Sequence, residues 1–150
     1  MGTQQILMIV LSVIIVGVAV GVGITMFQNQ AVNSNRQAVI ADLNNFAAQA
    51  IAWYKLPVNM GGGGNGEPGF LSSGSATAGL LSYIGFKTPE GEEKPSYGND
   101  NGDYELTATQ YTLTIVGKGK EKAGANNVQA TLTIDMTKVP GQQISLVVDY

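Results

Sequence analysis

Residues 99–103, Asn-Asp-Asn-Gly-Asp, carry the side chains most suited to chemistry, because they gather carboxylate and amide oxygens around a glycine. Oxygen ligands of this kind are those that calcium prefers. The segment does not match an EF-hand loop, since Tyr97 occupies the place of the first aspartate and no glutamate follows at the required distance. A calcium site and a solvated turn are therefore alternatives for these residues.

Residues 61–69, GGGGNGEPG, are rich in glycine but lack the Lys-Ser/Thr pair and the preceding strand of a phosphate-binding loop. They are predicted to form a flexible or tightly turning surface segment. The sequence contains no histidine and no cysteine, which removes the commonest general base, thiolate chemistry and disulfides. With a formal net charge of −3 it also lacks the basic patch of a nucleic-acid-binding protein. We expect a protein that is not an enzyme, has no cofactor and does not bind nucleic acid.

Charged residues are scarce and unevenly placed. They make up 13% of the chain, where about 25% is typical, and none precedes Arg36. Residues 6–27 are apolar except for Ser12 and Thr25. As a helix with a rise of ~1.5 Å per residue, this run is about 33 Å long, enough to cross a hydrocarbon core of about 30 Å. A cleaved signal peptide fits less well, because no basic residue precedes the run and no A-x-A cleavage pattern directly follows it. The run predicts a membrane-inserted segment.

The helical pattern continues beyond this run but becomes one-sided. Val39, Leu43, Phe46 and Trp53 recur at helical spacing, and no proline interrupts the chain before Pro57. The sequence therefore predicts one helix from about residue 3 to about residue 55. Residues 1–28 form its all-apolar part and residues 29–56 its amphipathic part, whose four named side chains should pack on a sheet.

After residue 104 the hydrophobic period changes to two. Leu113 and Ile115 continue an alternation that starts at Tyr111, and residues 130–136 and 144–148 alternate likewise. Residues 105–109 are a further candidate strand. Turns are expected at residues 117–127 and 137–143. Residues 57–103 should be a Gly-rich connecting region, which the apolar cluster 80–86 anchors to the core. The prediction is an α+β fold, in which the helix covers one face of an antiparallel sheet of three to four strands spanning residues 104–150.

A short polar start, the tetrad LMIV at residues 7–10 and an uncharged run that leads into an amphipathic half resemble the N-terminal helix of type IV pilins and pseudopilins. The resemblance covers about the first third of the chain. It implies the same helix-on-sheet fold and a structural subunit, a major pilin, that polymerises into an extracellular filament on the cell surface. The implied partners are other copies of this chain, the inner membrane before assembly and the pilus assembly machinery. A type II secretion pseudopilin and a single-pass membrane-anchored binding module are the alternatives.

Two features depart from the family pattern. The family usually has a glutamate at the fifth residue of the mature chain, where this sequence has Gln5 if Met1 is the mature start. The basic leader that ends in glycine is also not seen, so it was removed or is a minimal one ending at Gly2. A neutral amide avoids the cost of burying a carboxylate and can still form hydrogen bonds in a filament core. A polar cap at the membrane interface is the other interpretation of Gln4 and Gln5.

By this resemblance, the filament core is formed by one glutamine and by the apolar residues and glycines after it: Gln5, Ile6, Leu7, Met8, Ile9, Val10, Leu11, Ile14, Gly17, Gly21 and Gly23. The three glycines favour either close helix–helix packing, as in a G-x-x-x-G pair, or a local loss of helix on assembly. In the second case, we expect the break in the filament to fall within residues 17–23.

Overall fold

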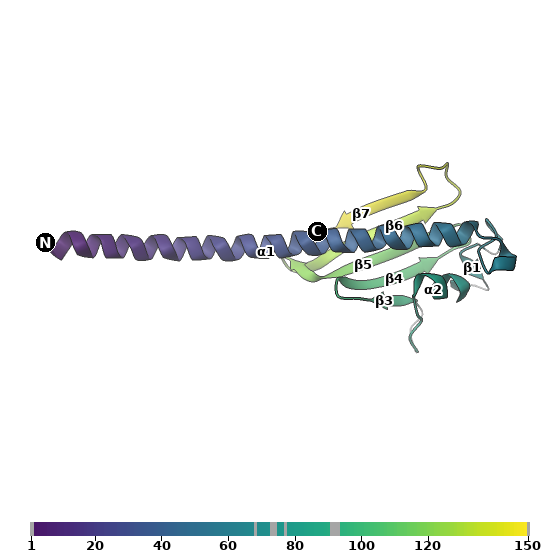
Figure 1. Ribbon diagram of the computed structural model, residues 1–150, viewed down its shortest axis with the longest axis horizontal. Helices are drawn as coiled ribbons and strands as arrows, with labels where there is room; N and C mark the ends of the chain where they lie inside the picture. Colours follow the sequence, from purple (N-terminus) through teal and green to yellow (C-terminus); the bar gives the residue numbers. More distant parts are fainter. Residues whose placement is uncertain (1, 68, 73–74, 77, 91–93, 150) are drawn as a thin grey trace.

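The computed structural model describes residues 2–67, 69–72, 75, 76, 78–90 and 94–149. Its dominant element is one continuous helix, α1 (Gly2–Lys55), of 54 residues. At ~1.5 Å per residue the helix is about 80 Å long. Figure 1 shows that its first half stands alone, whereas its second half lies along a sheet.

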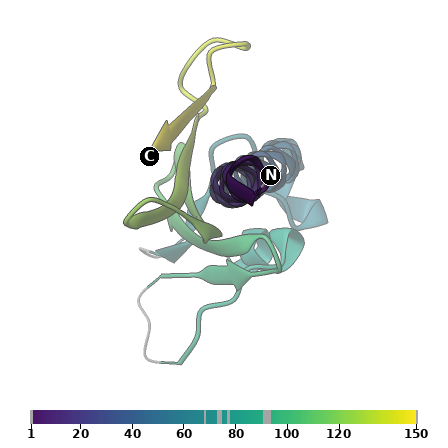
Figure 2. The ribbon, with the colours of Figure 1, turned by 90° about the vertical axis from the view of Figure 1, so that its left-hand side faces the viewer.

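The sheet has five antiparallel strands in chain order: β3 (Ser96–Gly98), β4 (Gly102–Ala108), β5 (Thr112–Ala123), β6 (Asn126–Asp135) and β7 (Ile144–Asp149). Figure 2, which looks along the helix, shows the sheet curving around one side of α1. The predicted α+β arrangement is confirmed. The predicted count of three to four strands is one short, because β3 lies in the segment expected to be a connector and pairs with residues 103–105 of β4.

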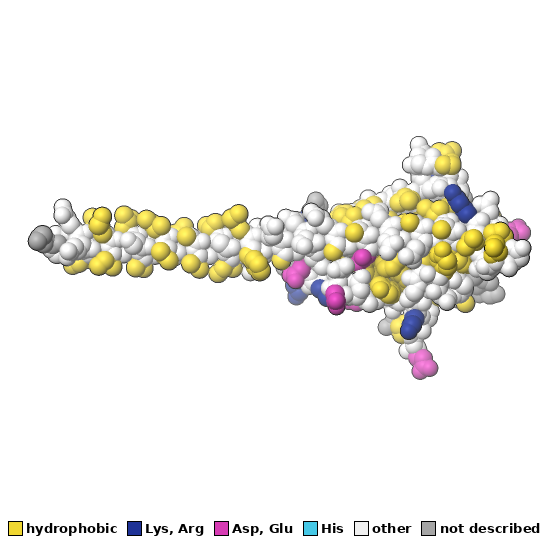
Figure 3. All heavy atoms as spheres, viewed as in Figure 1, with side chains coloured by type: hydrophobic (Ala, Val, Ile, Leu, Met, Phe, Trp, Pro, Cys, Tyr) yellow, Lys and Arg dark blue, Asp and Glu magenta, His cyan; other side chains and the backbone are white. Residues whose placement is uncertain are grey.

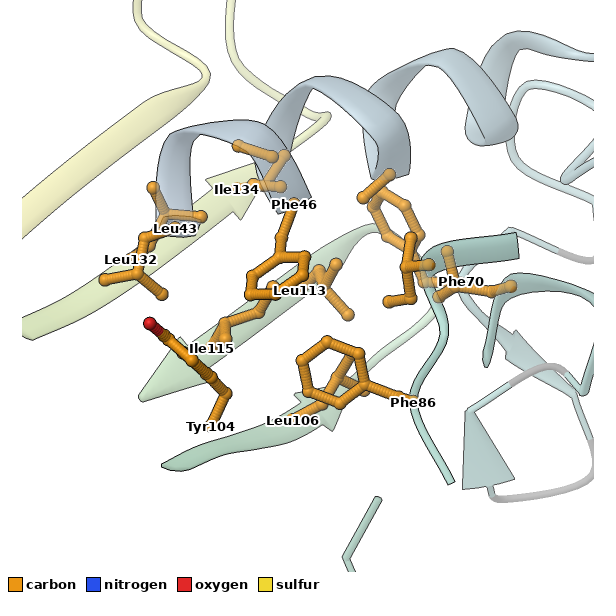
Figure 4. Close-up of a cluster of buried hydrophobic side chains, with 14 of the residues drawn as sticks. Leu43, Phe46, Phe70, Phe86, Tyr104, Leu106, Leu113, Ile115, Leu132 and Ile134 are labelled. Atoms are coloured by element: carbon orange, nitrogen blue, oxygen red, sulfur yellow. The ribbon is translucent and has the colours of Figure 1, made fainter. Parts of the chain in front are cut away.

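One hydrophobic core fills the space between α1 and the sheet. Val39, Leu43, Phe46 and Trp53 are buried on the helix side. They face fully buried side chains of the three central strands, several of which Figure 4 shows: Leu106, Leu113, Ile115, Leu132 and Ile134. Fully burying a side chain of this size contributes about 1.5–3 kcal/mol relative to leaving it in water. This packing fixes the axis of α1 relative to the sheet.

Phe46 is the centre of an aromatic cluster in this core. Its ring meets those of Phe86, Tyr97 and Tyr104 edge to face, with centroids 5.2 to 5.4 Å apart. Such pairs contribute about 0.5–1.5 kcal/mol beyond the area that they bury. The cluster joins α1 to β3, to β4 and to the segment that precedes β3.

The hairpin between β5 and β6 replaces the long turn predicted for residues 117–127. The two strands continue through this segment and leave a short turn around Gly124. Gly117 lies under α1, where an added Cβ would come within 2.9 Å of Val39 Cγ1, and Gly119 lies in the same way under Asn35. These glycines allow the helix to approach the strand closely, a use that sequence patterns do not separate from turn formation.

The connecting region holds several short elements: η1 (Val58–Met60), the paired strands β1 (Leu71–Ser72) and β2 (Ser75–Ala76), and α2 (Ala78–Ile84). Leu80, Ile84 and Phe86 are buried in the core, as predicted for the anchoring cluster.

The glycine-rich loop caps the C-terminal end of α1. Gly63 N–H donates to Trp53 O at 3.0 Å and Asn65 N–H to Tyr54 O at 2.9 Å, which satisfies carbonyls that the helix leaves unpaired. The Trp53 indole N–H donates in turn to Gly61 O at 2.9 Å. The loop turns tightly, as one predicted alternative has it, but it lies only partly at the surface: Gly61, Asn65 and Glu67 are exposed. The glycines at positions 62, 63, 66 and 69 are buried.

Two side chains assigned to inward positions are exposed. Tyr111 is 41% exposed, because β5 begins one residue later and Tyr111 lies in the preceding turn. Ile144 is 47% exposed, because it starts the edge strand β7, which α1 does not cover. β4 begins at Gly102, slightly before the predicted start of the sheet region.

Candidate functional site

The most unusual surface of the molecule is the first half of α1, and we call residues 6–27 the apolar shaft. Every residue from 2 to 30 is exposed, and the large hydrophobic side chains of the shaft are 50% to 76% exposed. Figure 3 shows hydrophobic side chains along its whole length, with no charged side chain among them. Monomeric soluble proteins rarely expose an apolar patch above a few hundred Å². A surface of this extent needs lipid or other protein chains around it.

The polar groups within the shaft are satisfied by the helix itself. Ser12 Oγ donates to Met8 O at 2.7 Å, and Thr25 Oγ1 donates to Val22 O at 2.8 Å. Such bonds let hydroxyl groups enter an apolar environment without an unpaired donor. The helix is long and apolar enough over this stretch to cross a membrane.

All residues expected in a filament core lie on this free part of α1, and the structure brings none of them against the folded domain. An added Cβ at Gly17, Gly21 or Gly23 would meet no atom within 4 Å, and the helix is regular through all three. Within a single chain, therefore, no other part of the protein packs closely against these glycines. The predicted break within residues 17–23 concerns the assembled filament and stays a prediction.

The residues expected to pack on the sheet occupy the other half of α1. Val39, Leu43, Phe46 and Trp53 lie in the core at 0%, 0%, 7% and 2% exposure. The structure thus separates the two predicted sets completely. One set fixes the helix to the domain, and the other projects away from it.

A polar cluster that sequence reasoning missed connects α1 to residues 99–104, and we call it the Asp42 clasp. Asp42 Oδ2 accepts hydrogen bonds from Asn99 Nδ2 at 2.8 Å, Asn101 Nδ2 at 2.8 Å and the Tyr104 hydroxyl at 2.7 Å. Asn99 Oδ1 accepts from the backbone N–H groups of Asn101 and Gly102. The segment is thus a turn bound to the helix, and among the described residues no group of three Asp, Glu, His or Cys side chains is placed to hold a metal ion.

The clasp shifts the ionisation of its two acidic groups. Partial burial alone would raise the pKa of the Asp42 carboxyl, but the hydrogen bonds from Asn101, Tyr104 and Asn99 outweigh it and hold that pKa below its usual value. Burial, followed by the hydrogen bond to Asp42, raises the pKa of the Tyr104 hydroxyl well above its usual value. Asp42 therefore stays ionised and Tyr104 protonated near neutral pH, which suits a permanent structural link.

Residues 28–36, which we call the neck, join the shaft to the domain. Asn35 secures this junction from the helix side: its Nδ2 donates to Asn101 O at 2.8 Å, and its Oδ1 accepts from Glu121 N–H at 3.3 Å. One side chain thus links α1 to the turn before β4 and to the β5–β6 hairpin. The shaft is held in a fixed direction relative to the domain.

Comparisons of the chain with models of protein families, with curated proteins and with solved structures gave no match. Its function is therefore inferred from the shaft, the neck and the domain themselves.

Proposed function

We propose that this protein is the structural subunit of a filament similar to a type IV pilus, held in a membrane by its shaft before assembly and polymerised through the same shaft. The observation that carries the proposal is a charge-free, fully exposed helix that continues without interruption into a packed domain. An enzyme or a ligand-binding domain has no evident use for such a projection beyond anchoring.

The energetics of the shaft suit a transfer between two apolar environments. Removing apolar surface from water is worth about 25 cal/mol per Å², and lipid tails or neighbouring shafts both achieve it. The exchange of lipid for neighbouring helices is therefore close to neutral in free energy, so tight packing and an external motor must drive assembly. Copies that pack head to tail through different surfaces form an open helical polymer.

The shape of the molecule fits such a polymer. Figure 1 shows the shaft and the domain arranged along one axis, and Figure 2 shows that the domain lies largely to one side of α1. Shafts can therefore cluster at the centre of a filament while the domains form an outer layer. The order of apolar half, amphipathic half and sheet, which resembles the pilins, supports the same arrangement.

Electron microscopy of the full chain, produced together with a pilus assembly system, tests the proposal. We expect long filaments of one subunit. Ile14→Asp should abolish them, because a carboxylate at the centre of an apolar helix costs about 2.5–3.5 kcal/mol in a membrane. The matched control, Gln142→Asp, adds the same charge at an exposed position of the domain and should leave filaments intact.

Three outcomes contradict the proposal. Filaments from the Ile14→Asp variant would show that the shaft is not in the core. A chain that stays in the membrane as a monomer under all conditions would favour a membrane-anchored binding module. Short assemblies that form only with a type II secretion system would favour a pseudopilin.

A further inference from the structure

The hairpin formed by β5 and β6 reaches further toward the shaft than the rest of the sheet. β4 begins at Gly102, opposite Gly119, and β7 ends at Asp149, opposite Gln129, so residues 120–125 extend past both neighbouring strands. This hairpin tip lies beside the last turn of the shaft and the first turns of the neck. It is the part of the sheet closest to the shaft (Figure 1).

An open groove of about 700 Å³ separates the hairpin tip from the helix, and we call it the neck groove. The helix contributes an apolar floor of Phe27, Ala31 and Val32. The hairpin contributes a wall that includes Lys120 and Lys122. Phe27 is also the last residue of the shaft, so the apolar surface of the shaft continues directly into the groove.

Hydrogen bonds hold the hairpin tip in place. Glu121 N–H donates to Asn35 Oδ1 at 3.3 Å, and Asn127 Nδ2 donates to Gly119 O at 2.9 Å. The pairing of β5 with β6 shifts register between Lys118 and Lys122, an irregularity of the kind that changes the direction of side chains. The two lysines of the groove are therefore presented from a fixed backbone.

The charges at this end of the domain favour an anionic ligand. Lys118 is already paired with Glu105, its Nζ 3.0 Å from Oε1. In the part of the chain that the structure describes, Lys120 and Lys122 have no carboxylate within 4.0 Å. Arg36 lines the adjoining part of the groove, and Glu121 is the one acidic residue of the hairpin tip.

The other acids at this end of the domain are not among the residues that line the neck groove, and they include Asp149, opposite Gln129 in the β6–β7 pairing. Asp103 sits opposite Lys118 in the β4–β5 pairing, and Asp100 precedes it in the turn that Asn35 holds. Figure 3 shows basic and acidic side chains gathered where the shaft meets the domain. Lys120 and Lys122 line the neck groove together with Phe27, the last residue of the shaft.

The position of the groove along α1 matches the depth of lipid headgroups. The shaft is about 33 Å long at ~1.5 Å per residue, slightly more than the hydrocarbon core of about 30 Å. The headgroup layers extend the bilayer to about 40–45 Å in total, which leaves about 5–7 Å on each side. Residues 28–32, which follow the shaft, span about 7.5 Å of helix, so a bilayer that surrounds the shaft places its phosphate layer at the neck groove.

We propose that the neck groove binds the phosphate group of an anionic phospholipid while the shaft lies in the membrane. Lys120 and Lys122 contact the phosphate oxygens, and Phe27, Ala31 and Val32 contact the first carbons of the acyl chains. The inference rests on the membrane-held state in the proposed function. Its consequence is that the domain stands on the bilayer in one orientation before assembly.

The test uses the full chain in phosphatidylcholine vesicles. The sequence has no cysteine, so Ala125→Cys places a single fluorescent label in the hairpin turn. Quenching of this label is compared between phosphatidylglycerol and phosphatidylcholine, each carrying a nitroxide at the same acyl position near the headgroup. The ratio of the two quenching strengths reports which lipid is enriched at the groove.

We expect phosphatidylglycerol to be enriched about fivefold or more, because one lysine near an anionic surface contributes about a factor of five. The enrichment should fall to about one in the Lys120→Gln/Lys122→Gln variant. It should also weaken as the Debye length falls from about 10 Å at 0.1 M salt to about 3 Å at 1 M. The control variant, Lys87→Gln/Lys94→Gln, removes two exposed lysines from the segment that leads to β3 and should keep the enrichment.

An enrichment of one in the unsubstituted chain, or an equal loss in the control, overturns the proposal. It is also overturned if alkaline carbonate extracts the chain from the vesicles, since the shaft then does not span them. If filaments require Lys120 and Lys122 but no lipid is enriched, the groove instead contacts a neighbouring subunit. If lipid is enriched but no filament ever forms, the lipid site stands and the filament proposal fails.

Discussion

The two halves of α1 share one backbone and differ in everything that surrounds it. Residues 2–30 are exposed on all sides, whereas the half that follows buries one face against the sheet. Both halves are regular helix, so the contact with the sheet is not what makes the chain helical. What differs is composition: the first half has hydrophobic side chains around its whole circumference, and the second confines them to one stripe.

The glycines follow the same division. Gly17, Gly21 and Gly23 lie in the free half, and the sequence has no further glycine until Gly61. Each glycine lowers helix stability by about 1 kcal/mol relative to alanine. The half that packs on the sheet therefore has the higher intrinsic helix stability. The exposed half, which contains the three glycines, has the lower one.

Leu43→Asp should have the largest effect, because it places an unpaired charge at the centre of the packed half. We expect the unfolding free energy of the domain to fall by about 4 kcal/mol or more, since it adds charge burial to the cost of losing a core leucine. Denaturant unfolding of the full chain in detergent measures it. Asn44→Asp, at an exposed position of the same helical turn, should change it by less than about 0.5 kcal/mol. A stable Leu43→Asp variant would mean that this side chain does not lie between helix and sheet.

Gly117→Ala and Gly21→Ala make the same change in the two environments. In Gly117→Ala the new Cβ would lie 2.9 Å from Val39 Cγ1 and 3.0 Å from Tyr104 Cδ1, so the unfolding free energy should fall by about 1–3 kcal/mol. In Gly21→Ala the methyl group meets nothing within 4 Å, and the stability of the domain should not change. Thermal unfolding of both variants side by side measures this difference. Equal effects would mean that α1 does not approach β5 closely at Gly117.

The Asp42 clasp predicts a pH dependence confined to the packed half. The folded pKa of Asp42 is lowered, so its contribution to stability is complete above the unfolded value of about 3.9 and is lost as the pH falls through the folded value. Hydrogen bonds to a charged but partly exposed group should contribute about 1–2 kcal/mol to the free energy of unfolding. Urea unfolding between neutral pH and pH 2.5 should show this loss. Asp42→Asn should abolish it, and Asp100→Asn, in the exposed part of the same turn, should retain it.

Deleting residues 1–28 should have the smallest effect on the folded domain. The shaft makes no contribution to the core, so the remaining chain should be a soluble monomer with an intact sheet and nearly unchanged stability. Circular dichroism and analytical ultracentrifugation test both statements. An unfolded fragment, or one that still forms filaments, would show that the two halves of α1 are not independent.

The sequence predicts most clearly what depends on no distant partner. The shaft is evident from an uncharged run, and the helix from its spacing and the lack of proline before Pro57. Glycine was the main source of error. Gly117 and Gly119 were expected in a turn but allow α1 to approach β5 closely, and the tightly turning glycines of residues 61–69 also cap a helix, which their pattern does not show. Asp42 was missed because its partners lie about 60 residues away, and no local pattern shows which amides will meet a carboxylate.

The direction of α1 over the sheet decides how the molecule would bear a mechanical load. Figure 1 shows the helix lying nearly along the strands, so a pull on the shaft slides the helix past the sheet instead of peeling it away. In sliding, the side chains from Val39 to Trp53 must lose their contacts together, and forced unfolding is governed by that single barrier. The glycine-bearing stretch of the shaft has the weakest helix and should lengthen first, from ~1.5 Å to ~3.3 Å per residue. Under tension, such a subunit would lengthen in its shaft while its domain kept its structure.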